Sequence, residues 1–565
     1  MKKLLTKTAF YGLFLMLLIG HSALAQEQHQ FTKADTLRGT ITPQRAWWEV
    51  NYYDLHVTVQ PKDSSISGYN HITYRVKKSP KQMQIDLQEP LQIDQVKQNG
   101  EDLPFHRVEN TNAYYIEVPK NLKKGSSHRI SIYYHGHPRV AVKPPWDGGF
   151  IWTQDSLGHK WIATAVQGLG ASAWWPNKDH QSAEPDSMSI NITVPDPMVD
   201  VSNGRLRGTT HHDNEMTTWS WFVSNPINNY DVAVNAGNYV NFSDTLHGKK
   251  GVLDLSYWVL KQDLDKAKKQ FQQVKPMIRC FEKWFGPYPF YEDSYKLVEA
   301  PHLGMEHQSA VAYGNGFENG YRGKDLSGTG WGLKWDFIII HESGHEWWGN
   351  SITTKDIADM WVHEGFTSYS ETIYTECQFG KKAGEEYVIG IRDRIKNDRP
   401  IIGKYGVNNE GSSDMYYKGN NMLHTIRNVI NNDSTWKSIL RGLQNDFYHQ
   451  TVTSKQVENY INERTKYNLE PVFDQYLRHT DIPVLQYKIK DGVLHYRWKA
   501  DVNNFDMPVK VTLSKGRFSF IYPTPKWKKK RLSLDNKADF RVDKNFYIKV
   551  DSVGTNEAVS ESNKK

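Results

Sequence analysis

The sequence predicts a multidomain α+β protein, in which an N-terminal antiparallel β domain, a mainly helical domain and a small C-terminal β module follow one another. Two observations lead to this prediction. The chain has 565 residues, of which 38% are hydrophobic, and a single hydrophobic core stops growing at roughly 250 to 300 residues. In addition, apolar residues recur at intervals of two near both ends of the chain and at intervals of three and four in the middle.

The first residues are typical of a secretory signal peptide. Three lysines precede an apolar run over residues 9–20, and the small residues Ala23 and Ala25 follow. The run is shorter than the roughly 20 residues that cross a bilayer. We therefore expect cleavage of residues 1–25, no stable membrane insertion afterwards, and export to a periplasm or out of the cell. The alternative, an uncleaved anchor helix, lacks a stop-transfer flank.

The overall charge argues against nucleic acid as a partner. Residues 1–25 hold three lysines and no acid, so their removal lowers the formal net charge from +7 to +4. A nucleic-acid-binding protein would concentrate basic residues on one face.

The cysteine content excludes a disulfide framework, since Cys280 and Cys377 are the only cysteines. Cys377 continues an apolar helical stripe formed by Phe366, Tyr369 and Ile373. We therefore predict a buried thiol at this position rather than a bridge.

Residues 40–245 form the predicted antiparallel β domain. Alternating segments such as YYDLHVTV, HITYRV, RISIYYHG and MSINITV are separated by Gly, Asn, Pro or Asp. Residues 246–482 form the predicted helical domain, because KQDLDKAKKQFQQVKPMIRCFEKWFG and later segments space their apolar residues at three and four. One strand-like piece, SYKLVEA, lies near the start of this domain.

Residues 483–552 return to alternation in LQYKI, VLHYRW, PVKVTL and NFYIKV, which predicts a small β domain. The basic run KWKKKR at residues 526–531 is interpreted as a solvated hairpin edge protected by lysine. The composition of residues 553–565 predicts a disordered tail.

One short segment, FIIIHESGHEWWGN at residues 337–350, combines two histidines and two glutamates behind an apolar run. His341, Glu342 and His345 match the pattern H-E-x-x-H. On a helix, residues four apart lie on one face, so both imidazoles can bind one zinc ion while Glu342 lies beside its water. The apolar residues before the motif and the Gly-Asn pair after it predict a buried helix.

A second helical pattern, MWVHEGFTSYSETIYTECQFG, supplies a candidate third ligand. Between His345 and Glu364 lie 18 residues, enough for a helix end, a loop and an antiparallel return. Two histidines, a carboxylate and one open position make a catalytic zinc site, whereas a structural site fills all four positions. Glu371, two turns further along the same face, can hydrogen-bond a ligand histidine; a surface or packing role is the alternative.

Several motifs in order resemble the gluzincin zinc aminopeptidases, the family of aminopeptidase N and leukotriene hydrolase. The family's H-E-x-x-H-x-W-x-G-N stands here as HESGHEWWGN, and its W-x-N-E-G-F-A as WVHEGFTSY. LGMEHQSA is similar to the family's G-x-M-E-N motif, and MYYKG to its Y-x-K-G. QGLGASAWWPNKD resembles the segment of the N-terminal domain that reaches into the active site. The resemblance covers residues 47–550.

The resemblance implies roles for further residues. Tyr416 would stabilise the tetrahedral intermediate. The substrate would lie along the strand edge that carries Gly304, Met305 and Glu306. Glu306 and Gln167 would hold the free α-amino group of the substrate, and one zinc ion would be the cofactor.

The resemblance also implies the architecture: a saddle-like N-terminal β domain, a thermolysin-like catalytic domain and a small C-terminal β sandwich. His307 and His363 stand where the family usually has asparagine, so the substrate edge and the pH profile should differ. We expect no counterpart of the large helical C-terminal domain of many members, and therefore a more open cleft.

The sequence thus predicts an exported zinc aminopeptidase that acts on peptides with a free N-terminus, with Glu342 as the base that activates water. A thermolysin-type endopeptidase is one alternative, although it would lack the amine-binding motif. An inactive envelope peptide-binding protein is another, although Glu342 and Tyr416 are both present. Epoxide hydrolysis, found in one branch of the family, has no support in the sequence. The oligomeric state and the preferred N-terminal side chain stay open.

Overall fold

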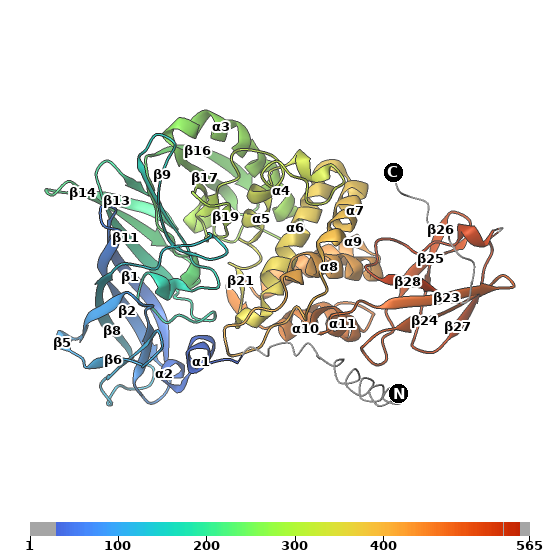
Figure 1. Ribbon diagram of the computed structural model, residues 1–565, viewed down its shortest axis with the longest axis horizontal. Helices are drawn as coiled ribbons and strands as arrows, with labels where there is room; N and C mark the ends of the chain where they lie inside the picture. The colour runs from blue at the N-terminus through green and yellow to red at the C-terminus, as the bar shows by residue number, and fades with distance from the viewer. Residues whose placement is uncertain (1–29, 535, 554–565) are drawn as a thin grey trace, which may run out of the picture.

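The computed structural model describes residues 30–534 and 536–553, arranged as three successive parts (Figure 1). A β-rich part, a helical part and a small β part follow one another along the longest axis. The predicted signal peptide at residues 1–25, and all but the first residue of the predicted tail at 553–565, lie outside the described residues. Among the described residues, no helix combines the length and the apolar character needed to cross a bilayer.

The N-terminal domain is built on an eight-stranded sheet with the order β13-β14-β11-β1-β2-β8-β4-β5. The bounds are β1 Trp48–Gln60, β2 Ser65–Val76, β4 Gln92–Gln98, β5 Glu101–Asp102, β8 Ser127–Gly136, β11 Ser187–Pro195, β13 Arg205–His212 and β14 Met216–Val223. The prediction of a β domain is confirmed, but a purely antiparallel sheet is wrong at one point. β1 and β11 pair in parallel, with Leu55 opposite Ile190. Alternation of side chains fixes which face is buried, not the direction of the neighbouring strand.

Shorter helices and strands complete this domain, and the segment that contains Gln167 follows one of them, β10. They are α1 Lys33–Gly39, α2 Pro43–Ala46, β3 Met83–Asp86, β6 Phe105–Arg107, β7 Ala113–Ile116, β9 Gly149–Gln154, β10 Lys160–Ala165, β12 Val199–Asp200 and β15 Asn235–Gly237. Trp174 and Trp175, in the segment after β10, are fully buried in the core of the domain. They anchor the chain that follows Gln167 and so hold this residue in place.

The helical part contains a five-stranded sheet, of which the sequence predicts only one strand. The order is β16-β17-β18-β20-β19. The bounds are β16 Tyr239–Gly248, β17 Gly251–Leu260, β18 Tyr295–Glu299, β19 Gly304–Met305 and β20 Val311–Tyr313. The predicted domain boundary at residues 245/246 falls within β16, whose hairpin with β17 continues into this sheet. β19 forms the open edge.

Helices pack behind and beside this sheet. Their bounds are α3 Leu264–Gln270, α4 Val274–Trp284, α5 Phe337–Gly344, α6 Trp361–Phe379, α7 Lys381–Gly390, α8 Tyr417–Ile430, α9 Asp433–Asp446, α10 Ser454–Glu463 and α11 Glu470–Arg478. The short strands β21 Ile352–Thr354 and β22 Gln450–Val452 pair in parallel among them. Every residue of α5 is buried, so the predicted buried motif helix is confirmed.

Cys280 and Cys377 form a disulfide bond, which corrects the prediction of a free buried thiol. Cys280 lies on α4 and Cys377 near the end of α6, and these helices pack against each other. Their Cα atoms are 6.1 Å apart although 97 residues separate them in sequence. The apolar stripe correctly indicates that this face of α6 is turned inward, but the partner across the interface is visible only in three dimensions.

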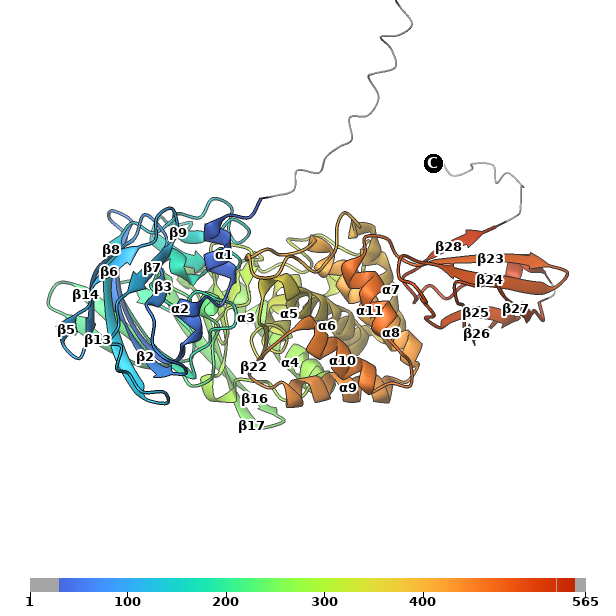
Figure 2. The same ribbon diagram turned by 90° about the horizontal axis from the view of Figure 1, so that it is seen from below.

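The C-terminal part holds two small sheets, seen as separate layers in Figure 2. The strands are β23 Val484–Lys490, β24 Val493–Lys499, β25 Val509–Ser514, β26 Arg517–Ile521, β27 Lys528–Arg531 and β28 Lys549–Ser552. The basic run at residues 526–531 supplies β27, an exposed edge strand of the order β27-β24-β23-β28. This confirms its interpretation as a lysine-rich edge.

Candidate active site

The motif helix α5 begins at a side-chain cap. The Asp336 carboxylate accepts hydrogen bonds from two backbone N–H groups of the first turn, which have no partner within the helix. The helix ends at Gly344, sooner than the Gly-Asn pair that the sequence predicts as its end. His345 is its C-cap and keeps right-handed helical dihedral angles. It therefore still shares a face with His341, and the two ring centroids are 5.0 Å apart.

Glu364 enters this face from the first turn of α6. Its Oε2 lies 3.6 Å from His341 Nε2 and 3.4 Å from His345 Nε2. One donor atom from each of the three side chains lies within 4.8 Å of the others. Among the described residues, the buried Glu364 Oε2 has no hydrogen-bond partner. Two imidazoles and a carboxylate with an unpartnered oxygen fit a zinc ion.

Hydrogen bonds on the far side of each imidazole fix its orientation. His341 Nδ1 donates to Glu371 Oε1 at 2.7 Å, and Tyr387 donates its hydroxyl to Glu371 Oε2 at 2.6 Å. His345 Nδ1 donates to the carbonyl oxygen of Trp348 at 3.0 Å. Both Nε2 atoms are therefore turned toward Glu364 with their lone pairs free for a cation.

The charges of this cluster favour a bound cation. Burial opposes ionisation of Glu364, but the imidazoles of His345 and His341 outweigh it and hold the pKa of Glu364 well below its ordinary value. Burial likewise opposes protonation of His341, yet Glu364 and Glu371 raise the pKa of His341 well above its ordinary value. Positive charge is therefore stabilised between these side chains.

Glu342 lies beside the candidate ligands, with its carboxylate against β19. A Cβ atom at Gly304 would be 2.6 Å from Glu342 Oε1, so glycine is needed at this point. Burial raises the pKa of Glu342 to about 7; the two histidine rings oppose this shift, and Glu306 and Glu364 add to it. A carboxyl group that gains and loses a proton near neutral pH suits general acid–base chemistry.

Glu306 and Gln167 meet at the end of β19, although 139 residues separate them. Gln167 Nε2 donates to Glu306 Oε1 and lies 3.5 Å from Glu364 Oε1. Tyr230, which the sequence analysis missed, donates its hydroxyl to the same Glu306 oxygen at 3.1 Å. Met305 continues the buried edge strand beside them. Gln167 and Tyr230 thus hold the Glu306 carboxylate next to the candidate metal ligands.

Tyr416 approaches the ligands from the residue before α8. Its hydroxyl donates to Glu364 Oε1 at 2.9 Å, and its ring stacks at 6.1 Å from that of His341. Burial first, and then the charges of Glu364 and Glu410, raise the pKa of Tyr416 well above its ordinary value. The hydroxyl therefore keeps its proton and can donate it to an oxygen near the metal position.

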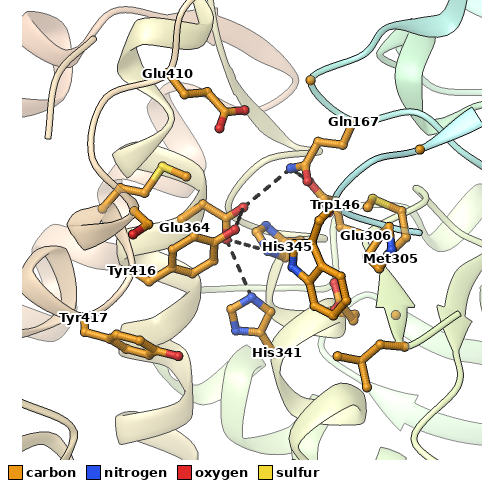
Figure 3. Close-up of a pocket in the computed structure, with 18 of the residues that line it drawn as sticks. Trp146, Gln167, Met305, Glu306, His341, His345, Glu364, Glu410, Tyr416 and Tyr417 are labelled. Atoms are coloured by element: carbon orange, nitrogen blue, oxygen red, sulfur yellow. Dashed lines mark hydrogen bonds and ion pairs between the residues drawn. The ribbon is translucent and has the colours of Figure 1, made fainter. Parts of the chain in front are cut away.

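These side chains line one cavity of about 1000 Å³ that both domains form (Figure 3). Trp146 and Glu410 also line it and are not among the residues predicted from the sequence. Trp146 is 62% exposed and extends from a loop of the N-terminal domain over the histidines. Neither residue belongs to a motif, and only the folding of distant segments brings them to the cavity.

The two histidines that replace asparagine lie next to the site, and neither belongs to the candidate ligand set. His363 Nε2 accepts the N–H of Thr354 at 2.9 Å. His307 is fully buried, with neither ring nitrogen hydrogen-bonded among the described residues. Burial lowers the pKa of both rings to about 3, so both are neutral at ordinary pH.

Comparison with known proteins finds matches for both the N-terminal and the helical domain. The model of the peptidase family M1 domain matches residues 270–476, and that of the peptidase M1 N-terminal domain matches residues 49–230. Leukotriene A-4 hydrolase of Xenopus laevis is 21% identical over 66% of this chain and 61% of its own length. Aminopeptidase N of Lactobacillus helveticus is 23% identical over 81% of this chain and 56% of its own. The chain therefore spans less than two thirds of the length of either relative.

Solved structures share the fold. The M1 zinc metallopeptidase from Deinococcus radiodurans is 19% identical, with a TM-score of 0.66 over 77% of this chain and 94% of its own. A mutant of that metallopeptidase bound to a Tyr-Ser-Ala substrate has a TM-score of 0.65, at 19% identity, over 79% of this chain and 98% of its own.

Proposed function

This chain belongs to peptidase family M1, and we propose that it is a zinc-dependent aminopeptidase that hydrolyses the first peptide bond of peptides with a free N-terminus. The observation that carries the proposal is the position of Glu306 and Gln167 beside the metal ligands. A carboxylate held there binds an α-ammonium group, so that only the first peptide bond reaches the metal. The aminopeptidases among the relatives, and the related metallopeptidase mutant bound to Tyr-Ser-Ala, support peptides as the substrate class.

His341, His345 and Glu364 would hold the zinc ion. When bound there, zinc supplies Lewis acidity, which lowers the pKa of a water molecule towards about 7 and polarises the scissile carbonyl. Glu371 keeps His341 oriented through the hydrogen bond at Nδ1, and the Trp348 carbonyl does the same for His345.

Glu342 moves the proton. Its carboxylate takes a proton from the attacking water as the water oxygen bonds to the carbonyl carbon. It then gives this proton to the leaving amine as the C–N bond breaks. The products are a free amino acid and a peptide shortened by one residue, and Glu342 returns to its starting state.

Tyr416 would stabilise the negative charge that develops on the carbonyl oxygen. Its hydroxyl already lies within hydrogen-bond distance of Glu364, hence beside the metal position. A donor held in place before the reaction costs no rearrangement when the charge appears.

The test compares unblocked dipeptide amides with their N-acetylated counterparts. Wild type and Glu342→Gln are assayed for release of free amino acid, each with and without a zinc chelator. We expect wild type to cleave only the free-amine set, and both the substitution and chelation to abolish cleavage.

Other outcomes separate the alternatives. Cleavage of the acetylated peptides at comparable rates would contradict the roles of Glu306 and Gln167 and favour an endopeptidase. No cleavage of either set by zinc-loaded wild type would favour a peptide-binding protein.

We also propose that the protein is exported, as residues 1–25 suggest. The bond between Cys280 and Cys377 supports this, because disulfides persist mainly in oxidising compartments. Detection of the full-length, uncleaved chain with both thiols reduced in the cytoplasm would contradict export.

The C-terminal β sandwich at residues 483–552 is a further proposal. The buried side chains of Trp498 on β24 and Val511 on β25, one from each small sheet, belong to one apolar cluster and support it. A crystal structure in which the two sheets do not face each other would contradict it.

A further inference from the structure

Glu410 is a carboxylate of the cavity that the proposed mechanism does not use. It lies in the irregular segment before α8 and lines the cavity with Gln167, Glu306 and Glu364. Its Oε1 is 3.4 Å from the point where a Cβ on Gly168 would lie, next to Gln167. Figure 3 shows its carboxylate directed into the cavity on the side of Glu364 and Gln167.

Nothing in the described part of the chain satisfies this carboxylate. Glu306 accepts hydrogen bonds from Gln167 and Tyr230, and Glu364 accepts them from Tyr416 and, at 3.5 Å, from Gln167. Among the residues that the structure describes, none forms a hydrogen bond with the Glu410 side chain and no cation lies within ion-pair distance of it. A half-buried carboxylate without a partner is unfavourable, which indicates that its partner arrives with the substrate.

Arg399, a basic residue that also lines the cavity, is engaged elsewhere. Burial raises the pKa of Glu410 to about 7 and Glu364 and Glu306 add to this shift, whereas Arg399 opposes it. Its guanidinium donates to the carbonyl oxygen of Gly411 at 3.0 Å instead of forming an ion pair. Glu364 and Glu306, in contrast, are close enough to repel the charge of Glu410.

The formal charges of the cavity leave one negative charge without a partner. Glu306, Glu342, Glu364 and Glu410 carry four negative charges when all are ionised. Three further acids and three bases also line the cavity, and their formal charges cancel: Asp147, Glu371, Asp393, Arg394, Lys396 and Arg399. A zinc ion on neutral imidazoles contributes two positive charges, and the α-ammonium group of a substrate contributes one. One negative charge is left, and Glu410 is the carboxylate with no assigned partner.

We propose that Glu410 binds the side chain of the first substrate residue and selects a positively charged one, arginine or lysine. This inference rests on the proposed aminopeptidase function and adds a substrate class to it. The first side chain branches from the carbon that carries the α-amino group, so it starts beside Gln167. Gly168, which has no side chain, follows Gln167 in sequence and lies close to the Glu410 carboxylate in space. A guanidinium can engage a carboxylate through two parallel hydrogen bonds.

Arginine and citrulline separate charge from shape. Their side chains have nearly the same size, but only arginine carries a positive charge at neutral pH. We compare kcat/KM for the two N-terminal residues on one dipeptide amide scaffold, with wild type, Glu410→Gln and Glu410→Ala. Wild type should prefer arginine by about 10-fold or more, in line with a charged hydrogen-bonded pair, and both variants should bring the ratio close to one.

Asp393→Asn is the matched control. Asp393 lines the same cavity and is exposed, so its removal changes the overall field of the cavity by one charge without touching Glu410. The arginine preference should persist in this variant. An equal loss of preference in Asp393→Asn would overturn the assignment to Glu410.

A binding measurement makes the test independent of turnover. Calorimetric titration of arginine amide and citrulline amide into zinc-loaded Glu342→Gln, with and without Glu410→Gln, should show a preference for arginine only when Glu410 is present. Thermal unfolding of each variant excludes a folding defect. An equal loss of affinity for both amides in Glu410→Gln would assign Glu410 to the α-amino group and overturn the proposal. An unchanged ratio of the two affinities would overturn it as well. Failure of wild type to cleave any unblocked substrate would instead overturn the aminopeptidase function, and an arginine preference in binding would still be measurable.

Discussion

Each candidate ligand histidine uses one ring nitrogen for the protein and keeps the other for the metal. His341 donates from Nδ1 to Glu371, and His345 donates from Nδ1 to a backbone carbonyl. A ring held in this way cannot rotate to present the wrong nitrogen. The geometry of the metal site therefore depends on residues that contact the ligands without binding the metal themselves. Among them, Glu371 contacts both His341 and Tyr387.

Glu371→Gln should weaken zinc binding about 10- to 100-fold, because an amide is a weaker acceptor for the imidazole N–H. The dissociation constant is measured by competition with a chromogenic chelator. Tyr387→Phe, which removes only the hydroxyl that donates to Glu371, is the graded control and should weaken zinc binding less. Unchanged affinity in Glu371→Gln would assign this residue a packing role.

Tyr416→Phe should lower kcat by about 10² to 10³, since it removes a donor to the developing oxyanion. KM and zinc content should stay close to wild type. Tyr417→Phe is the matched control, because Tyr417 lines the same cavity without a hydrogen bond to the candidate ligands. A fall in zinc content rather than in kcat would mean that Tyr416 acts only by holding Glu364.

Among the elements, β19 and α5 approach each other so closely that the contact limits which residue fits at position 304. Gly304 on β19 faces Ile338 and Glu342 on α5, and a Cβ atom there would lie 2.9 Å from Ile338 Cγ2 as well as 2.6 Å from Glu342 Oε1. The strand edge and the candidate base are thus held in register by direct contact. The resemblance assigns Gly304 to the substrate edge, and the structure adds this packing requirement.

Gly304→Ala should lower kcat/KM about 100-fold, because displacement of a catalytic group by about 1 Å has an effect of this size. Zinc content should be retained. Gly208→Ala on β13, where a Cβ atom would meet open space, is the control and should behave as wild type. Full activity in Gly304→Ala would show that Glu342 tolerates displacement.

At the scale of the whole molecule, the cavity exists only when the N-terminal and helical domains are in contact. Gln167 and Trp146 come from the first domain, and the metal ligands and Glu306 from the second. Tyr230 donates across the same boundary to Glu306. A shift between the domains would therefore disturb the amine subsite while leaving the metal ligands intact, because all three lie on α5, its C-cap and α6.

The stability of the molecule should depend on pH through Glu299. Burial raises the pKa of this group from 4.5 to about 8, so the folded protein binds its proton more tightly than the unfolded chain. The stabilisation is fully present below about pH 4.5 and is lost as the pH rises through about 8. Between pH 5 and 9 this group should lower the free energy of unfolding by a few kcal/mol.

Glu299→Gln should flatten this dependence, because the amide stays neutral throughout. Urea denaturation of wild type and variant at several pH values between 5 and 9 measures the difference. Parallel curves would show that Glu299 does not titrate in this range.

The sequence by itself determined the features that lie within one element or one motif. The spacing of His341 and His345 follows from helix geometry, the apolar run before them predicts burial, and the alternation in β1 and β11 predicts which face is inward. The resemblance added Glu306, Gln167 and Tyr416 because their motifs are short and contiguous. Local patterns carry this information since neighbouring residues share one backbone geometry.

Only the tertiary structure decided which distant segments meet. It pairs β1 with β11 in parallel, joins Cys280 to Cys377, and brings Tyr230 and Glu410 to the cavity. None of these contacts has a periodic or motif signal, because each depends on how separate elements pack rather than on the order of residues within one. The same reason applies to the charge left unpaired at Glu410, which becomes visible only when the carboxylates of four separate segments surround one cavity.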